Sequence, residues 1–231
     1  MRRTLRITGT MLVTLGVLGL AWSVVVWRWQ DPFTALYTHW QQGKLAHQYD
    51  HLQNEWKPPK RSTTTAAAAS ERSAIAGDAA AYRRTSHPGE AIGRIVVGRI
   101  GLNMVLVDGT DESSLQKGPG RDPRTYMPGQ NRLVYIAGHR TTFLAPFAHI
   151  NDIRAGDYIR IEVPYGTFVY RAFRHEIVPA NAMQMLRSPD HELLRLQACH
   201  PRFFATHRYI VDARLVSVTP REGRPYTVKA T

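Results

Sequence analysis

The sequence contains a single cysteine, Cys199, among 231 residues. One thiol cannot close an intramolecular disulfide, so the fold cannot depend on such a bond. A lone cysteine is either a small buried apolar side chain or a reactive thiol, and the count alone does not separate these readings. The residues around Cys199 therefore have to decide its role.

Acidic residues are also few: 18 Asp and Glu stand against 30 Lys and Arg, which gives a formal net charge of +12. Residues 90–219 hold sixteen basic and twelve acidic residues, so they carry only +4 of that charge. A nucleic-acid-binding domain concentrates positive charge on its folded part, and this distribution argues against nucleic acid as a partner. It suits attraction to anionic lipid or to a cell-wall polymer.

Charge is absent from one long stretch, the 21 residues between Arg6 and Arg28. As a helix this stretch spans roughly 30 Å, the thickness of one hydrocarbon core. It is long for a cleaved signal peptide, and no small-x-small cleavage site follows it. We predict that residues 1–29 are an uncleaved single-pass anchor in the cell membrane. Flanking arginines and tryptophans predict a cytoplasmic N-terminus and an extracytoplasmic remainder: Arg2, Arg3, Trp22, Trp27 and Trp29.

Residues 30–89 are predicted to form a juxtamembrane helix followed by a disordered linker. Asp31-Pro32 is typical of a helix start, and the helix is expected to end near Trp56. Three of its residues have metal-ligand spacing, but no fourth ligand accompanies them, so a solvated helix face is the better interpretation: His47, His51 and Glu55.

The linker is predicted from the composition of residues 57–89. The segment Lys57-Pro58-Pro59-Lys60 stops the helix, and the run STTTAAAAS is of low complexity. Such a stretch buries too little apolar surface to offset its ordering entropy, which favours a flexible tether. The alternative is a lid that folds across a groove, since Ile75 and Tyr82 lie among the small residues.

Residues 90–219 alternate short β-like runs with turns rich in Gly, Pro, Asn and Asp. The pattern predicts an all-β domain, a closed or nearly closed β-barrel with short helical insertions. Residues 220–231 are predicted to be a flexible tail. The expected strands are 92–100, 103–108, 132–138, 158–163, 166–178, 193–199 and 208–218, with helical turns near 111–117, 146–150 and 182–186.

The strand that contains Cys199 places this residue outside the core. In LLRLQAC the period of two puts Leu194, Leu196 and Ala198 on one face and Cys199 on the other. The chain then turns at His200-Pro201. A structural cysteine would share the apolar face, so the pattern favours a thiol that is presented to a groove.

Two further residues stand at strand ends. Arg208 begins a strand on its non-core face, after eight residues suited to a loop between antiparallel neighbours. If the strands pair, its guanidinium can hold an oxyanion and favour the thiolate, a role for which Arg202 is the alternative. His139 follows an apolar strand and Gly138, where a base is held by a rigid element yet exposed.

The blocks AGHRTTFLAPF (137–147) and LQACHPRFFATHRYIV (196–211) resemble the histidine and cysteine–arginine blocks of sortases. Within that superfamily they most resemble class E sortases of high-GC Gram-positive bacteria. Papain-like enzymes run Cys before His, and the Ser-His-Gly-Cys signature of L,D-transpeptidases is absent. The chain departs from the family at Arg195-Leu196-Gln197-Ala198-Cys199, where Thr-Leu-x-Thr-Cys is usual, and at Phe143, where class E commonly has Tyr.

The resemblance implies a sortase-like eight-stranded closed β-barrel behind one N-terminal transmembrane helix. It also implies a cysteine transpeptidase in which Cys199 attacks the Thr–Gly carbonyl of a sorting signal, His139 moves protons and Arg208 stabilises the oxyanion. The implied partners are secreted proteins with an LAxTG- or LPxTG-like signal, an amine of lipid II or a pilin, and the membrane. Candidate signal contacts are Thr141, Thr142, Phe143, Ala182, Met183, Met185 and Ala198.

Two other functions remain open at this point. One is a non-catalytic, membrane-tethered protein that binds the cell wall through the same fold. The other is an enzyme that hydrolyses its thioester instead of transferring the acyl group. We expect no metal and no cofactor, since no acidic cluster demands one.

Overall fold

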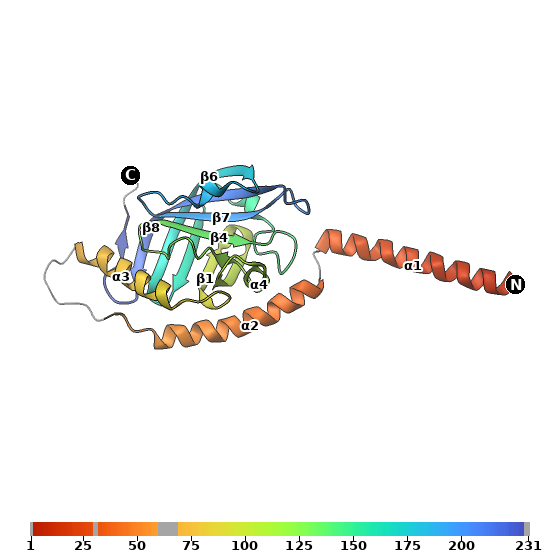
Figure 1. Ribbon diagram of the computed structural model, residues 1–231, viewed down its shortest axis with the longest axis horizontal. Helices are drawn as coiled ribbons and strands as arrows, with labels where there is room; N and C mark the ends of the chain where they lie inside the picture. Colours follow the sequence, from red (N-terminus) through yellow and green to blue (C-terminus); the bar gives the residue numbers. More distant parts are fainter. Residues whose placement is uncertain (1, 30–31, 60–68, 229–231) are drawn as a thin grey trace.

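The computed structural model describes residues 2–29, 32–59 and 69–228. Three N-terminal helices precede a β-barrel that carries short helical turns (Figure 1). The helices are α1 Arg2–Trp29, α2 Pro32–Glu55, α3 Ala69–Thr85 and the short α4 Glu112–Leu115, with 3-10 turns η1 Gly98–Ile100, η2 Ile150–Asp152 and η3 Met183–Leu186. The strands are β1 Ala91–Val97, β2 Leu102–Asp108, β3 Gly120–Arg121, β4 Leu133–Gly138, β5 Tyr158–Val163, β6 Gly166–Pro179, β7 Leu193–His200, β8 His207–Pro220 and β9 Tyr226–Thr227.

Eight strands close the barrel, which confirms the predicted architecture. They follow the order β6-β5-β1-β2-β3-β4-β7-β8, and β8 returns to pair with β6. This closing pair runs from Gly166↔Pro220 to Pro179↔His207. The β2–β3 and β4–β7 pairs are parallel, whereas the other pairs are antiparallel. The parallel β4–β7 pair brings together the strand that ends just before His139 and the strand that contains Cys199.

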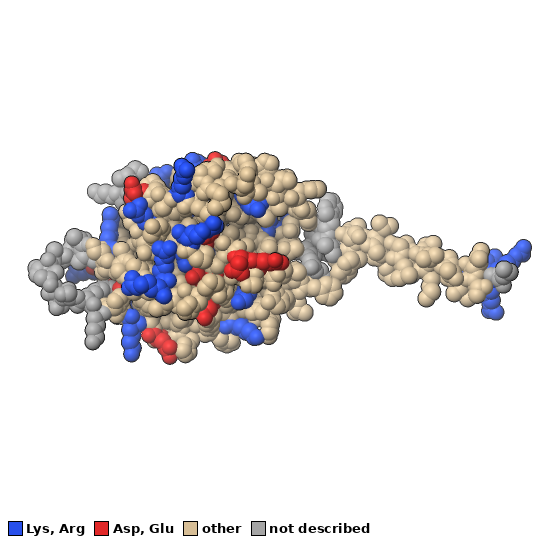
Figure 2. Space-filling view, in the orientation of Figure 1, with Lys and Arg blue, Asp and Glu red and all other residues tan. Residues whose placement is uncertain are grey.

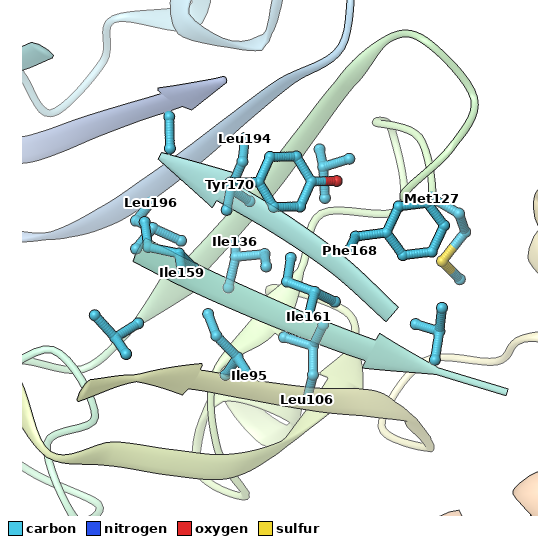
Figure 3. Close-up of a cluster of buried hydrophobic side chains, with 14 of the residues drawn as sticks. Ile95, Leu106, Met127, Ile136, Ile159, Ile161, Phe168, Tyr170, Leu194 and Leu196 are labelled. Carbon is cyan, nitrogen blue, oxygen red and sulfur yellow. The ribbon is translucent and has the colours of Figure 1, made fainter. Parts of the chain in front are cut away.

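Alternate residues of each strand fill the barrel interior. Ile159 and Ile161 of β5 meet Phe168 and Tyr170 of β6, together with side chains from the other strands (Figure 3). All four are fully buried, and burial of each such side chain stabilises the fold by about 1.5–3 kcal/mol. The three apolar residues that the sequence assigned to the core face of β7 belong to this cluster: Leu194, Leu196 and Ala198.

The predicted juxtamembrane helix is present as α2, and it is docked on the barrel. Leu45 and Tyr49 are buried against β1 and β2. The Gln42 side chain adds a pair of hydrogen bonds to β2: its Nε2 donates to the Val105 carbonyl (3.1 Å), and the Val105 amide donates to its Oε1 (2.7 Å). The predicted cap Asp31 lies outside the described residues. His51 and Glu55 are exposed, and no cluster with the makings of a metal site occurs among the described residues.

The predicted linker is wrong for residues 69–85, which form α3. Ile75, Ala79 and Tyr82, spaced four and three residues apart on one helix face, insert into the barrel core. Tyr82 packs edge-on against the rings of Trp56 and Tyr165. This apolar stripe packs against the core at the end of the barrel. Its burial there offsets the entropy lost when the segment is ordered, a gain that the composition of the segment does not reveal. Residues 60–68 lie outside the described residues.

The predicted tail is wrong in part. Tyr226–Thr227 forms β9, which pairs with Ser217 and Val218 of β8, and the Tyr226 side chain packs against the core. The Arg224 amide donates to a Glu71 carboxylate oxygen of α3 (2.8 Å). Residues 229–231 lie outside the described residues.

Helix α1 is long and apolar enough to cross a membrane over Arg2–Val25. The side chains of residues 2–24 are exposed, and Figure 2 shows no Lys, Arg, Asp or Glu along this stretch beyond the basic residues at its start. Trp22 is exposed, whereas the side chains of Trp27 and Trp29 lie outside the described ones. The chain therefore has one candidate membrane span among its described residues.

Because α3 is part of the core, Ile75→Ala should lower the free energy of unfolding by about 2–4 kcal/mol, through lost transfer energy and the cavity left behind. Urea unfolding of the full chain in detergent micelles measures this. The control Arg84→Ala, at an exposed position of α3, should change stability by less than about 0.5 kcal/mol. Equal effects of the two changes would mean that α3 is a dispensable attachment.

Candidate active site

Three neighbouring strands bring the predicted catalytic residues to one end of the barrel. In the parallel β4–β7 pair Gly138 lies opposite Ala198, so His139 and Cys199 occupy the next level on adjacent strands. In the antiparallel β7–β8 pair Cys199 lies directly opposite Arg208. Neighbouring strands are about 4.8 Å apart. The side chains therefore stand side by side in the order His139, Cys199, Arg208.

All three residues line one groove of about 280 Å³. The outer face of β4 and β7 forms its floor, and the segment from Val178 to Leu186 forms a wall. The polar lining residues are Thr110, Asp122, Arg124, Tyr135 and Gln197; the apolar ones include Leu115, Val178, Ala182, Met183, Met185 and Leu186. The groove thus combines a reactive end with an apolar wall. Helix α3 contributes no residue to it, so this segment is not the lid considered above.

The predicted signal contacts divide into three groups. Ala182, Met183 and Met185 line the groove. Ala198 does not, because the strand alternation that turns Cys199 to the groove turns Ala198 into the barrel core, where it is fully buried; that prediction is wrong. The loop residues after His139 are not among the lining residues: Thr141, Thr142 and Phe143.

Phe147 holds the backbone around His139 in place. The Phe147 amide donates to the His139 carbonyl (3.0 Å), and the Phe147 ring lies against Gly138. A Cβ at position 138 would come within 2.7 Å of that ring, so any residue other than glycine would force the buried ring to move. The His139 ring packs on Phe143, with 5.0 Å between centroids.

Arg140 ties the ends of β4 and β7 together, a role that the sequence did not reveal. Its Nη1 donates to the Cys199 carbonyl (3.2 Å) and lies 3.0 Å from His200 Nδ1. Its Nη2 donates to Asn151 Oδ1 (2.7 Å). Position 140 lies directly after the histidine, and a buried arginine there can reach the neighbouring strand.

The two arginine candidates differ in position. Arg208 lines the groove, and its Nη1 donates to the carbonyls of Ala205 (2.8 Å) and His207 (2.9 Å), which hold the guanidinium at the start of β8. Arg202 is not among the lining residues, and its guanidinium lies over the Phe203 ring. The geometry therefore favours Arg208 over Arg202 as the partner of the thiol.

A family model described as the sortase domain matches residues 95–216, more than half of the chain and nearly all of the barrel. The chain belongs to the sortase family.

Two curated relatives are similar to this sortase. Sortase D of Bacillus subtilis is 29% identical over 133 residues, which cover 56% of this chain and 66% of that protein. Sortase SrtE1 of Streptomyces coelicolor is 24% identical over 237 residues, which cover 95% of this chain and 60% of that protein. The sortase described here thus spans about two thirds or less of the length of these relatives.

Solved structures share the fold. A sortase D5 transpeptidase of Clostridium perfringens superposes with a TM-score of 0.61 at 22% identity, covering 76% of this chain and 98% of that chain. Sortase E of Streptomyces avermitilis gives a TM-score of 0.53 at 26% identity, covering 59% and 94%. Together with the relative from S. coelicolor, the latter supports the class E resemblance.

The wall of the groove in this sortase is held by a buried ion pair at the family departure noted above. Arg195 donates through Nε and Nη2 to the Asp212 carboxylate (2.7 and 2.9 Å) and through Nη1 to the Met185 carbonyl (2.7 Å). The arginine that replaces threonine in the usual strand end thus clamps η3 against β7 and β8. The sequence alone shows at position 195 only the loss of a threonine hydroxyl, because the partners of the arginine lie elsewhere in the chain.

Electrostatics of the site centre on His139. Burial lowers the pKa of this imidazole, and the nearby carboxylate of Glu112 partly counteracts the shift. The neutral form of His139 therefore dominates at pH 7. Its Nε2 is buried and has no hydrogen-bond partner among the described residues.

We expect His139 to titrate below the ordinary histidine pKa of about 6.5 in this sortase. Glu112→Gln removes a charge that favours imidazolium, so it should lower the His139 pKa further. NMR of the histidine ring resonances across pH measures both shifts. Glu222→Gln, on the loop between β8 and β9, is the control and should leave the His139 titration unchanged. A pKa that rises in Glu112→Gln would contradict this electrostatic account.

Proposed function

We propose that this sortase is a cysteine transpeptidase that cleaves the Thr–Gly bond of a C-terminal sorting signal and joins the new carboxyl end to an amine. The observation that carries the proposal is the side-by-side placement of His139, Cys199 and Arg208 at one end of a groove. Membership of the sortase family supports it.

In the first half-reaction neutral His139 takes the proton of the Cys199 thiol. The resulting thiolate attacks the carbonyl carbon of the threonine, and the carbonyl oxygen becomes an oxyanion. The Arg208 guanidinium, fixed at the start of β8, stabilises this charge in the groove. The C–N bond then breaks as protonated His139 gives its proton to the leaving glycine amine. A thioester on Cys199 remains.

In the second half-reaction an acceptor amine enters where the glycine left. Neutral His139, the form that burial favours, takes a proton from this amine as it attacks the thioester carbonyl. The tetrahedral adduct collapses, the C–S bond breaks and the Cys199 thiolate returns.

The groove wall suits the apolar residues of a sorting signal. Met183 and Met185 present adaptable side chains there, and the class E resemblance favours LAxTG over LPxTG. Sortase E1 of S. coelicolor has been solved with a tripeptide in its active site. We propose that the substrates are secreted proteins bearing such a signal and that the acceptor is an amine of lipid II or a pilin.

Helix α1 supports a proposal about the compartment. We propose that α1 crosses the cell membrane once, with its basic start in the cytoplasm and the barrel outside, as the positive-inside rule predicts. Secreted substrates and lipid-linked wall precursors meet on that side of the membrane.

The alternative function is a non-catalytic wall-binding protein on the same fold. The complete set of thiol, imidazole and guanidinium in one groove argues against it, because a binding module has no need of a nucleophile and its base. Hydrolysis of the thioester by water uses the same residues and differs only in the acceptor.

The decisive experiment is mass spectrometry of the full chain incubated with an LAxTG peptide. We expect an acyl adduct on Cys199 and its disappearance when an amine such as triglycine is added. Cys199→Ala should abolish the adduct while changing the free energy of unfolding by no more than about 1–2 kcal/mol, since the half-buried thiol leaves little cavity. Peptide bound without an adduct would support the wall-binding alternative, and free acid in place of the triglycine product would indicate hydrolysis.

His139→Ala and Arg208→Ala should each lower kcat/KM for peptide cleavage by at least ~10², as expected when a general acid–base or an oxyanion donor is removed. Arg208→Lys should recover little, because one ammonium cannot reproduce the planar guanidinium. Arg202→Ala is the matched control, a nearby arginine that is not among the groove-lining residues, and should stay near the wild-type rate. A silent Arg208→Ala beside a damaging Arg202→Ala would reverse the arginine assignment.

A further inference from the structure

Helix α2 has a second apolar face, opposite the one that docks on the barrel. Phe33, Leu36, Tyr37 and Trp40 follow the spacing of one helical stripe. All are exposed, Phe33 by 72% and Leu36 by 71%. Large apolar side chains gathered on one exposed face are costly in water and indicate a surface that contacts something apolar.

The loop between β7 and β8 adds to this surface. Phe203 and Phe204 follow the catalytic strand within five residues of Cys199, and Phe204 is 77% exposed. The start of α2 lies at the same end of the barrel, because the Phe143 amide in the loop after His139 donates to Thr34 Oγ1 (3.1 Å). We call Phe33, Leu36, Tyr37, Trp40, Phe203 and Phe204 the aromatic end of the domain.

The aromatic end is continuous with the candidate membrane span. Helix α1 ends at Trp29 and α2 begins at Pro32, so the chain leaves the bilayer within a few residues of Phe33. Trp22 of α1 and Phe33 of α2 have ring centroids 5.8 Å apart. On the face seen in Figure 2, Lys and Arg gather over the half of the domain away from α1, whereas the part beside α1 is almost free of charge.

We propose that the aromatic end inserts into the interface of the lipid bilayer and holds the groove mouth at the membrane surface. Tyr37 and Trp40 favour this region, where the ring contacts lipid and its O–H or N–H contacts water. The phenylalanines and Leu36 add apolar surface that gains from contact with lipid. An apolar helix face beside a span lies in the interface plane in the same way. The acceptor amine of a lipid-linked precursor would then arrive at the height of Cys199.

A second copy of the chain is the other possible occupant, but the bilayer is the better one. The aromatic end lies where a bilayer must already be if α1 spans it. The inference rests on the proposed anchoring by α1 and is independent of the transpeptidation chemistry.

The experiment uses the full chain with Cys199→Ala, which frees the protein of its native thiol. Single cysteines are introduced by Leu36→Cys, Phe204→Cys and, as the control on the β8–β9 loop, Glu222→Cys. Each is labelled with the fluorophore NBD and reconstituted into vesicles of equal parts phosphatidylglycerol and phosphatidylethanolamine. Lipid with a doxyl quencher at carbon 5 of the acyl chain is then included, so that quenching reports contact with the interface.

We expect doxyl lipid to quench the labels at positions 36 and 204 at least twofold more than the label at position 222. Adding Trp40→Glu should reduce the quenching at position 204 at least twofold, because a carboxylate on the aromatic end opposes its insertion. Quenching at position 204 that equals the control would overturn the proposal, even if position 36 is quenched. The proposal would also be overturned if the NBD labels entered an apolar environment in a way that depended on protein concentration and not on doxyl lipid, since that result indicates contact with a second copy.

The proposal and the transpeptidase function fail separately. The labelled chains lack the nucleophile, so their quenching does not depend on catalysis, and the acyl-adduct experiment uses a soluble peptide that needs no bilayer.

Discussion

The backbone pairing of β4 with β7 is the constraint on which the site depends. Because the two strands run parallel with Gly138 opposite Ala198, the next residue of each is carried to the same level. A shift of one residue would turn Cys199 into the barrel and Ala198 into the groove. The apolar alternation of β7 prevents this shift, since it would expose Leu194 and Leu196 and bury Arg195 in the core. Core packing thus sets the positions of the reactive groups.

Buried ionic groups fix the positions of the segments around the thiol. Asp212 accepts from Arg195 and also from Arg174, whose Nη2 lies 2.7 Å from the same carboxylate. Such pairs add little net stability, because desolvation of the charges offsets their attraction. Their effect here is geometric: an uncompensated Asp212 would be costly, so Arg195 stays in place and with it the Met185 carbonyl. Arg140 does the same for the Cys199 backbone.

The strand pattern made much of the fold predictable, and with it the meeting of the three candidate catalytic residues. Alternation separated Leu194 from Cys199 and placed Arg208 on the same face as the thiol, and the run of short strands indicated the closed barrel. What it missed depended on partners distant in sequence. The stripe of Ile75, Ala79 and Tyr82 is too short to predict a stable helix. Packing against the barrel end supplies the stabilisation that the sequence pattern does not show. The clamp by Arg195 depends on Asp212 and Met185 lying near it in the fold. Asp122 and Arg124, which also line the groove, lie outside both motifs. The prediction that Ala198 contacts the sorting signal conflicts with the strand alternation itself, which places Ala198 in the barrel core.

The docking of α2 has a consequence for how far the groove can travel. A barrel on a flexible tether would explore a hemisphere of solution, with a radius set by the linker length. Here α2 is fastened to β1 and β2 by Gln42, Leu45 and Tyr49, and the low-complexity stretch falls between two helices that are both packed on the barrel. Its length therefore cannot set the reach of the groove. With α1 in the membrane as proposed, the search for substrates becomes two-dimensional, because lateral diffusion and rotation about the membrane normal replace the swing of a tether.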